Sequence, residues 1–544
     1  MTPRQRMTVL IATAAVAVTR WLALSRTLWD WDEAQFVLAL RHFDIAAHHP
    51  HPPGFPLFVA AGKAMQWIGF DEFHALQALS FIAAVLIVPA MTSFALAAGA
   101  DFLTSLLASL ILAFFPNVWF YGGTALSDVP SMTLIVLALA LLLSDNLYAG
   151  AIVLGVAAGI RPQNLLIAAA PCAIVIWRHR KRAVPPLLIT AAIVIVSYGA
   201  AAWATGGWGV FLDALRRHQA YLARVDAWTN PTRPPLTHLI DDFFFRPYRA
   251  PLINVLTTLL VLIALVRVAT GAPASRRALA AFAPFCLAAW LMLDHFSVSR
   301  FSVGYAPLFA MLAADGLALL KPRMQAIAGG AYIALMIVWT WPALTVVRTT
   351  ISPPVAAANW IGANVHREVV VDPRMAAFGD ALLPSMKRRG ALWSAQPGDV
   401  LLTDVPGAIT FRRPHGRLWD LARRRYFEAS VSPVQSPFAF GEGWYGQETS
   451  ADEVWRWMGQ RSRTRLLAPC SEVVLDFYAP VPGATISIMF HGTLWDRFKP
   501  TAAEFMRTYY VKVPREMVIE TDRVARNAND PRALGLRLKG IECR

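Results

Sequence analysis

Long apolar runs separated by short polar stretches dominate the first 350 or so residues of the chain. Runs of about 20 residues with few charges are typical of helices that cross a membrane. A break at residues 161–164 separates two of the runs, because proline removes a backbone donor and favours a bend. The pattern predicts eleven spans, at residues 8–25, 75–98, 103–119, 129–144, 147–160, 164–177, 184–204, 251–268, 278–294, 303–320 and 324–346.

The pattern changes after the last apolar run. Residues 348–440 combine a predicted helix at 356–365 with short β-like runs at 368–371 and 400–403, which indicates a small α/β subdomain. The fold class expected for the whole chain is therefore a mainly α polytopic membrane protein, with its transmembrane domain at residues 1–347, followed by an extracytoplasmic α/β and β-sandwich region.

The final segment, residues 441–544, is predicted to be mostly β. Runs at 471–478 and 484–490 are separated by Pro-Gly and His-Gly turns, which favours a β-sandwich. Cys470 and Cys543 lie in or next to this segment and can pair in an oxidising compartment, but two cysteines alone do not establish a disulfide.

Composition and charge agree with a membrane protein. Of the 544 residues 56% are hydrophobic and only 16% are charged, which is less charge than soluble domains carry. The net charge of +15 lies largely in short loops, above all at 178–182, 276–277 and 321–323, so it indicates topology rather than nucleic-acid binding. Placing these loops in the cytoplasm puts the N-terminus inside and residues 348–544 outside, and the protein in the cell inner membrane facing the periplasm.

The same orientation gathers unusual polar residues on the outer face, beginning with three acids after the first span. A carboxylate near the bilayer is costly unless it faces water or a partner. Asp32 or its neighbours Asp30 and Glu33 can act as a general base that takes a proton from an acceptor hydroxyl. The alternative is a helix N-terminus, where acidic residues are favoured by the helix dipole.

Histidines follow in the same predicted outer loop. His48, His49 and His51 lie in or beside a Pro-Pro-Gly turn, with His42 and Asp44 a few residues before them. Such a group can bind a divalent metal, or it can be solvated or hydrogen-bonded. The spacing is not that of a strict metal motif, so no cofactor is predicted to be required.

Further along, an acid and two arginines fall on the same predicted face. Asp128 precedes a span, where Ser127 or Asp128 can cap the helix that starts at Pro130. Arg161 lies at the predicted break, and Arg300 precedes another span. Arginines can clamp a phosphate through their forked donors, or they can reach for the membrane interface. Acids and arginines gathered on one face are stronger evidence for a site than any of them alone.

Five short motifs, taken in order, resemble those of GT-C glycosyltransferases. They are residues 31–36 (WDEAQF), 51–56 (HPPGFP), 125–130 (ALSDVP), 159–163 (GIRPQ) and 300–307 (RFSVGYAP). The first two look most like the first outer loop of the protein O-mannosyltransferase and aminoarabinose-transferase group. The resemblance extends over roughly residues 20–350.

The resemblance implies an inverting hexosyl- or mannosyltransferase that uses a polyprenyl-phosphate-linked sugar. Asp32 would be the base, Glu33 would assist or orient it, and Asp128 would be a second acid that supports the site or binds the acceptor. Arg161 and Arg300 would hold the lipid phosphate. The implied partners are membrane lipids, the lipid-linked donor and a glycan, lipid or protein acceptor, with no nucleic acid.

The chain also departs from the family pattern. His51 stands where many relatives have lysine, so its role in binding phosphate is open, and Asp30 is a rival for the base. The C-terminal segment resembles β-sandwich modules of glycan-assembly proteins, in which aromatic residues stack on sugars. The alternative is that Trp444, Trp455 and Trp457 belong to the sandwich core. The rival functions are a transporter or flippase of lipid-linked glycans and a non-catalytic glycan-assembly protein.

Overall fold

A computed structural model of residues 1–544 shows a chain that folds into two units. Unit 1 comprises Met1–Val355 and Arg413–Phe427, and unit 2 comprises Ala356–Arg412 and Glu428–Arg544. The structure describes all residues except 226–234, 236, 238–249, 292–297, 367, 387, 390, 391, 396–398, 414–426, 435, 450–453, 469, 512–514, 528, 529 and 544.

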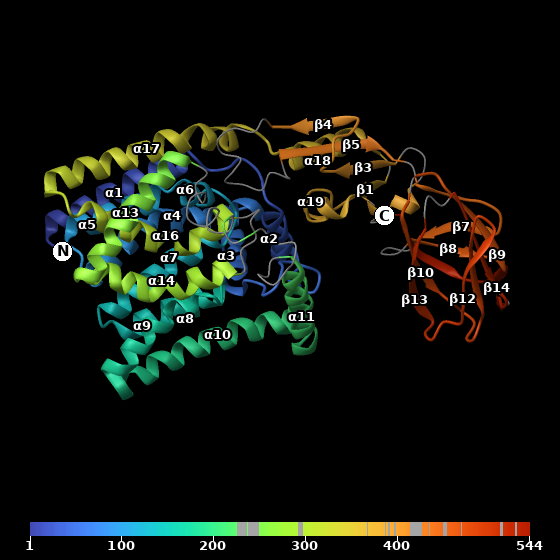
Figure 1. The fold of residues 1–544 in the computed structure, drawn as a ribbon, viewed down its shortest axis with the longest axis horizontal. Coiled ribbons are helices and arrows are strands. Elements are labelled where there is room, and N and C mark those ends of the chain that lie inside the picture. The colour runs from blue at the N-terminus through green and yellow to red at the C-terminus, as the bar shows by residue number, and fades with distance from the viewer. Residues whose placement is uncertain are drawn as a thin grey trace. The chain divides into compact units, whose positions relative to one another are not determined.

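Unit 1 is a bundle of helices (Figure 1), which confirms the mainly α fold class. Eleven of its described helices match the eleven apolar runs in order. They are α1 (Pro3–Trp21), α4 (Glu72–Ala97), α5 (Phe102–Phe114), α7 (Asp128–Leu143), α8 (Leu147–Ile160), α9 (Asn164–His179), α10 (Val184–Ala204), α13 (Pro251–Thr270), α14 (Pro273–Leu291), α16 (Ala306–Leu317) and α17 (Pro322–Thr349).

Within the described part of the chain, four helical stretches are long and apolar enough to cross a membrane. They are Glu72–Ala97, Asn164–Ala204, Pro251–Ala269 and Pro322–Asn364. Four shorter apolar helices accompany them, so the chain is a membrane protein. The number of spans and their orientation stay predictions.

The shorter helices of unit 1 lie between the long ones and carry much of the polar sequence. They are α2 (Trp31–Arg41), α3 (Pro56–Trp67), α6 (Pro116–Tyr121), η1 (Arg180–Ala183), α11 (Trp208–Val225), α15 (Val298–Phe301) and η3 (Ser302–Tyr305). The predicted span at 103–119 is wrong at its end, because α5 ends at Phe114 and α6 is separate. Proline disfavours helical backbone in the residue before it, and Phe115, before Pro116, has the extended ψ of 129°.

The predicted break between α8 and α9 is confirmed. Arg161 has extended backbone angles, with φ −140° and ψ 116°, as expected for a residue that precedes proline. The side chain of Asn164 donates to the Ala157 carbonyl at 2.7 Å and to Ser131 Oγ at 2.8 Å. These bonds tie the start of α9 to the end of α8 and to α7.

Unit 2 begins with the small α/β subdomain that the sequence predicts. Its sheet has the strand order β2-β1-β3-β5-β4, with β2, β1 and β3 parallel and β3, β5 and β4 antiparallel. The elements are α18 (Pro353–Asn364), β1 (Val369–Val371), η4 (Pro373–Met375), α19 (Ala376–Leu382), β2 (Arg388–Arg389), η5 (Leu392–Ser394), β3 (Val400–Thr403), β4 (Ile409–Arg412) and β5 (Glu428–Pro433).

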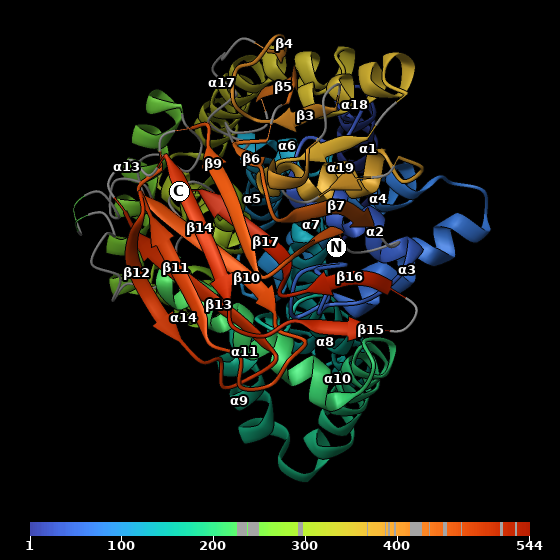
Figure 2. The same cartoon turned by 90° about the vertical axis from the view of Figure 1, so that its right-hand side faces the viewer.

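The rest of unit 2 is a β-sandwich of two five-stranded antiparallel sheets, seen as two layers in Figure 2. One sheet has the order β13-β10-β17-β8-β7 and the other β12-β11-β14-β9-β6. The strands are β6 (Phe438–Phe440), β7 (Trp444–Thr449), β8 (Val454–Met458), β9 (Arg461–Leu466), β10 (Glu472–Tyr478), β11 (Ile486–Phe490), β12 (Thr493–Phe498), β13 (Glu504–Tyr510), β14 (Glu516–Thr521) and β17 (Arg537–Cys543), and a separate pair is formed by β15 (Ala525–Asn527) and β16 (Asp530–Leu534).

The sandwich core and its boundary differ in detail from the prediction. Because β6 pairs with β9, the sandwich begins before the predicted boundary between residues 440 and 441. Trp444 packs against the core and donates to Thr464 Oγ1 at 2.9 Å. Trp455 and Trp457 on β8 are only half-buried.

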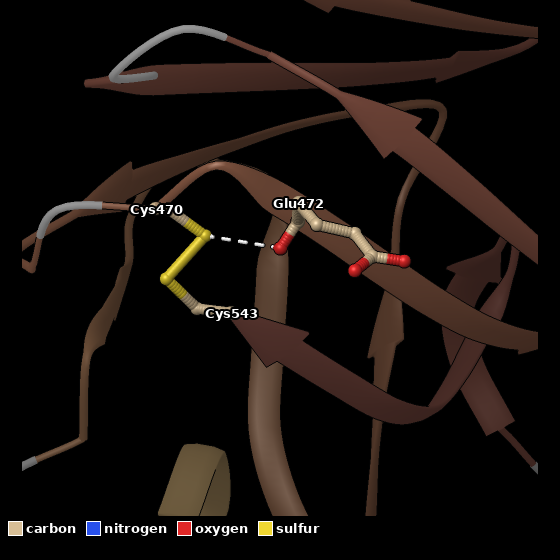
Figure 3. Close-up of a disulfide and its surroundings, with 3 residues drawn as sticks. All are labelled: Cys470, Glu472 and Cys543. Carbon is tan, nitrogen blue, oxygen red and sulfur yellow. Dashed lines mark hydrogen bonds between the residues drawn. A yellow bond between two sulfur atoms is a disulfide. The ribbon is translucent and has the colours of Figure 1, made fainter. Parts of the chain in front are cut away.

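A disulfide joins Cys470, just before β10, to Cys543 at the end of β17 (Figure 3). The two strands are neighbours in one sheet, with Val473 opposite Cys543. Among the described residues, Cys172 in α9 and Cys286 in α14 are free. The sequence left the pairing open, and the register of β10 and β17 brings the two cysteines together.

Candidate active site

The site begins at the N-terminus of α2, where acidic residues cap the helix. Asp30 is the N-cap residue, and its carboxylate accepts from the backbone N–H of Asp32 at 2.9 Å. Glu33 bonds back to the Asp30 N–H at 2.8 Å, which completes a capping box. The capping interpretation of this cluster therefore applies to Asp30 and Glu33, whereas the Asp32 carboxylate faces Arg300 and His51.

Glu33 is fully buried and bound by backbone groups of two segments. Besides Asp30, its carboxylate accepts from the N–H of Trp29 at 2.5 Å and from the N–H of Ala125 at 2.8 Å. Burial raises the pKa of this carboxyl to about 7, although the backbone donors act against the shift. Glu33 thus ties the first turn of α2 to the segment that leads into Asp128.

Arg300 brings together the three aspartates predicted for the site. Its guanidinium donates to Asp32 Oδ2 and, at 3.0 Å, to Asp128 Oδ2, and it lies 3.7 Å from Asp30 Oδ1. Arg300 and Asp128 are almost completely buried. Burial alone would lower the pKa of Arg300, but Asp128 and Asp32 hold it well above its ordinary value.

Arg161 approaches Asp128 from the break between α8 and α9. Its Nη2 lies 2.8 Å from Asp128 Oδ2, its Nε donates to Ser127 Oγ at 3.0 Å, and its guanidinium lies 5.2 Å from the centre of the Phe55 ring. Ser127 holds the N-cap position of α7, as one of the two predicted caps, but its side chain makes no capping bond, and α7 starts at Asp128 and not at Pro130. Both side chains bind Arg161 instead.

The charges of this cluster do not cancel. Three carboxylates, of Asp30, Asp32 and Asp128, face two guanidinium groups, of Arg161 and Arg300. Burial lowers the pKa of Arg161, and Asp128 opposes this shift. A buried array of this kind has fixed positive groups that can receive an oxyanion and fixed carboxylates that can accept a proton.

His51 lies on the other side of Asp32. Its Nδ1 is 2.9 Å from Gln35 Oε1 and 3.7 Å from Asp32 Oδ1, whereas Arg300 binds Oδ2. Burial lowers the pKa of His51 to about 4, so the ring is neutral near pH 7. The turn after it needs glycine, because Gly54 has φ +101° and a Cβ there would lie 2.8 Å from Ile45.

The remaining histidines of the loop separate from one another. His49 joins Asp44 in a backbone bridge, and the exposed His48 faces His218 of α11, with 6.1 Å between ring centres. His218 also lies 6.1 Å from His51. Among the residues that the structure describes, no group of three or more His, Cys, Asp or Glu side chains is placed to hold a metal ion.

Sequence reasoning missed Gln35 and His218, and it considered Ser127 as a helix cap and not as a partner of Arg161. The side chain of Gln35 falls one turn of α2 after Asp32, on the same side, so helical spacing could have indicated it. His218 belongs to α11, far along the chain, and no nearby motif marked it.

The fold and the charged cluster define an integral membrane protein whose buried acids and arginines meet where helices begin and end. No protein-family model matches the chain, and no curated protein matches it in sequence. Solved structures with a similar fold include the three described next.

These structures are distant in sequence. Arabinosyltransferase EmbB from Mycobacterium smegmatis is 12% identical with a TM-score of 0.41, over 100% of this chain and 66% of EmbB, which is slightly less than two thirds. ArnT from Cupriavidus metallidurans is 12% identical with a TM-score of 0.45, over 74% of this chain and 93% of ArnT. The Archaeoglobus fulgidus oligosaccharyltransferase is 11% identical with a TM-score of 0.49, over 98% of both chains. The functional argument therefore rests on the geometry of the site.

Proposed function

We propose that the protein is an integral membrane glycosyltransferase that moves a sugar from a polyprenyl-phosphate-linked donor to an extracytoplasmic acceptor, with inversion. The observation that carries the proposal is the cluster of Asp32, Asp128, Arg161 and Arg300, which combines a buried carboxylate with two buried guanidinium groups. A sugar transfer with a phosphate leaving group needs both.

In the proposed reaction Asp32 takes the proton from an acceptor hydroxyl. The hydroxyl oxygen attacks the anomeric carbon from the face opposite the phosphate, and the bond from that carbon to the phosphate oxygen breaks. The electron pair leaves with the polyprenyl phosphate, whose developing charge Arg161 and Arg300 stabilise. Asp128 fixes both arginines at the spacing observed, and Glu33 holds the backbone that carries Asp30 and Asp32.

Asp30 is the less suitable base. Its Oδ1 already accepts the Asp32 N–H as the helix cap, so that oxygen is engaged by the backbone. His51 is predicted from the sequence to contact phosphate, but it is neutral and lies on the Oδ1 side of Asp32, so we assign it to orienting Asp32. The phosphate role then falls to the two arginines.

The proposal includes an orientation, with the N-terminus in the cytoplasm and unit 2 in the periplasm. The basic loops at 178–182, 276–277 and 321–323 favour the cytoplasm. The disulfide between Cys470 and Cys543 suits an oxidising compartment. A polyprenyl tail would then remain in the bilayer of the inner membrane while the sugar reaches the outer-face residues.

A transporter or flippase of lipid-linked glycans is the main competing function. Transporters place binding residues near the bilayer midplane, on interrupted helices. Here Asp32 lies in the first turn of α2, Asp128 at the start of α7 and Arg161 just after α8. Charged groups at helix ends favour chemistry at headgroup depth over passage across the membrane.

The direct test compares Asp32→Asn with Asp30→Asn in the full-length protein in lipid nanodiscs. Loss of the base should reduce sugar transfer from a polyprenyl-phosphate-linked hexose, mannose first, by about 10²–10⁴-fold. Binding of the donor should persist in Asp32→Asn, and Asp30→Asn should retain more activity. The donor is identified by mass spectrometry of the lipid-linked sugars that accumulate in a deletion strain. Undiminished transfer by Asp32→Asn would exclude Asp32 as the base.

A further inference from the structure

Helix α11 presents one face to the first predicted outer loop. Phe211, Ala214 and Leu215 pack with Ile45 in a small cluster at the end of α10. His218 follows at the next position of the same helical face, because residues at i, i+3, i+4 and i+7 lie on one side of a helix. Figure 1 shows α11 turning away from the axis of α10. The packing against Ile45 places this face beside the segment after α2.

The side chains on this face become more buried toward Asp32. Tyr221 is 52% exposed and stacks with His218, with 6.4 Å between ring centres. His218 is half-buried and lies 6.1 Å from His51, which is mostly buried beside Asp32. Solvent exposure therefore falls along the series Tyr221, His218 and His51 toward Asp32.

Asp32 has different neighbours on its two oxygens. Arg300 binds Oδ2, and Arg161 shares Asp128 with Arg300. The Arg161 guanidinium lies over the Phe55 ring, which packs against His51. Oδ1 faces His51. If the phosphate occupies the arginine side, the proton of the acceptor hydroxyl is delivered most directly to Oδ1, from the histidine side.

We infer that His48, His51, His218 and Tyr221 form the acceptor subsite, and that the acceptor is a neutral sugar. This inference rests on the proposed transferase function. A neutral imidazole has one donor and one acceptor nitrogen, which suits hydroxyl groups, and the half-exposed tyrosine offers an aromatic face for a sugar ring. In His51 the Nδ1 already faces Gln35 Oε1, so Nε2 is the nitrogen that remains for a ligand. Burial lowers the pKa of His48, His51 and His218, which favours neutral rings. Arg217, which pairs with Asp213 on α11, is a charged neighbour of His48.

The test measures binding of neutral disaccharides, namely mannobiose, cellobiose and galactobiose, to the full-length protein in nanodiscs by saturation-transfer NMR. At least one should bind to the wild type, and its Kd should rise at least fivefold in Tyr221→Ala and in His218→Gln. Tyr148→Ala is the matched control, because Tyr148 is 56% exposed at the start of α8, and its Kd should stay at the wild-type value. Tyr221 is exposed, so its replacement should leave the thermal unfolding of the protein unchanged.

Two results would overturn the inference. One is that no neutral disaccharide binds while a threonine-containing peptide or a glucuronate disaccharide does. The other is that Kd is the same in wild type, Tyr221→Ala and His218→Gln. Sugar transfer is measured in the same samples: if the wild type transfers sugar but the two variants match it, the acceptor subsite is wrong and the transferase stands. If disaccharide binding depends on His218 and Tyr221 but no lipid-linked donor is consumed, the transferase is wrong and the sugar site stands.

Discussion

The two units use charged residues in opposite ways. In unit 1 the side chains of Arg300 and Asp32 are 4% and 11% exposed, whereas in unit 2 those of Arg463 and Glu516, paired across β9 and β14, are 54% and 37% exposed. An exposed pair loses little hydration and contributes little stability. A buried cluster loses its hydration and is stable only while its partners remain. Unit 1 therefore keeps a costly arrangement that packing alone does not require, which is typical of a functional site.

The largest expected effect comes from breaking the buried cluster. Arg300→Gln leaves the carboxylates of Asp32 and Asp128 buried without their shared cation, and this should lower the free energy of unfolding by about 3–5 kcal/mol. Circular dichroism in detergent would record the loss of helix as denaturant is added.

The matched control is Arg463→Gln in unit 2, which removes an ion pair of similar length, 2.7 Å between Nε and Glu516 Oε1. It should change the free energy of unfolding by less than about 1 kcal/mol. Equal effects of the two substitutions would show that burial does not distinguish the two units.

The next effect concerns what stabilises unit 2. The disulfide closes a loop with a sequence separation of 73 residues, so Cys470→Ser should destabilise the sandwich by about 4 kcal/mol in the chain-entropy model. Loss of tertiary fluorescence from the sandwich tryptophans on heating would report it.

Cys172→Ser is the control, because Cys172 is a free thiol within α9. It should leave the unfolding of unit 2 unchanged. If a reducing agent does not reproduce the effect of Cys470→Ser, the loss comes from packing around the serine and not from the missing bridge.

The fold was largely predictable from the pattern of apolar runs. A long apolar run in a membrane protein forms a helix, and short runs between turn residues form strands, with few other structures open to either. The misplaced end at α5 has a local cause, Pro116, whose effect on Phe115 outweighed the apolar pattern around it. The shift of the sandwich boundary depends on the pairing of β6 with β9, which a single strand sequence does not specify.

The site was predictable only in part. Orientation placed Asp32 and Arg300 on one face, but their direct bond joins residues 268 positions apart and depends on the packing of the helices. Asp30 and Glu33 could have been recognised as caps, since an acid at the N-cap and Glu three residues later is a capping box. His218 was missed because its proximity to His51 depends on the path from α10 into α11, which carries no local signal.

The smallest expected effect is the pH dependence contributed by His51, which tests the consequence of burial within unit 1. Burial lowers its pKa from the ordinary 6.5 to about 4, so between these pH values the unfolded chain binds a proton that the folded chain does not. The stabilising contribution of the neutral ring is present above pH 6.5 and is lost as the pH falls toward 4, by up to about 3 kcal/mol. His51→Asn should flatten the fall in thermal stability of unit 1 over this range, whereas His42→Asn, at an exposed histidine of the same segment, should keep the wild-type curve. If both variants follow the wild type, the burial of His51 beside Asp32 does not control its protonation, and the assignment of a neutral imidazole beside Asp32 fails with it.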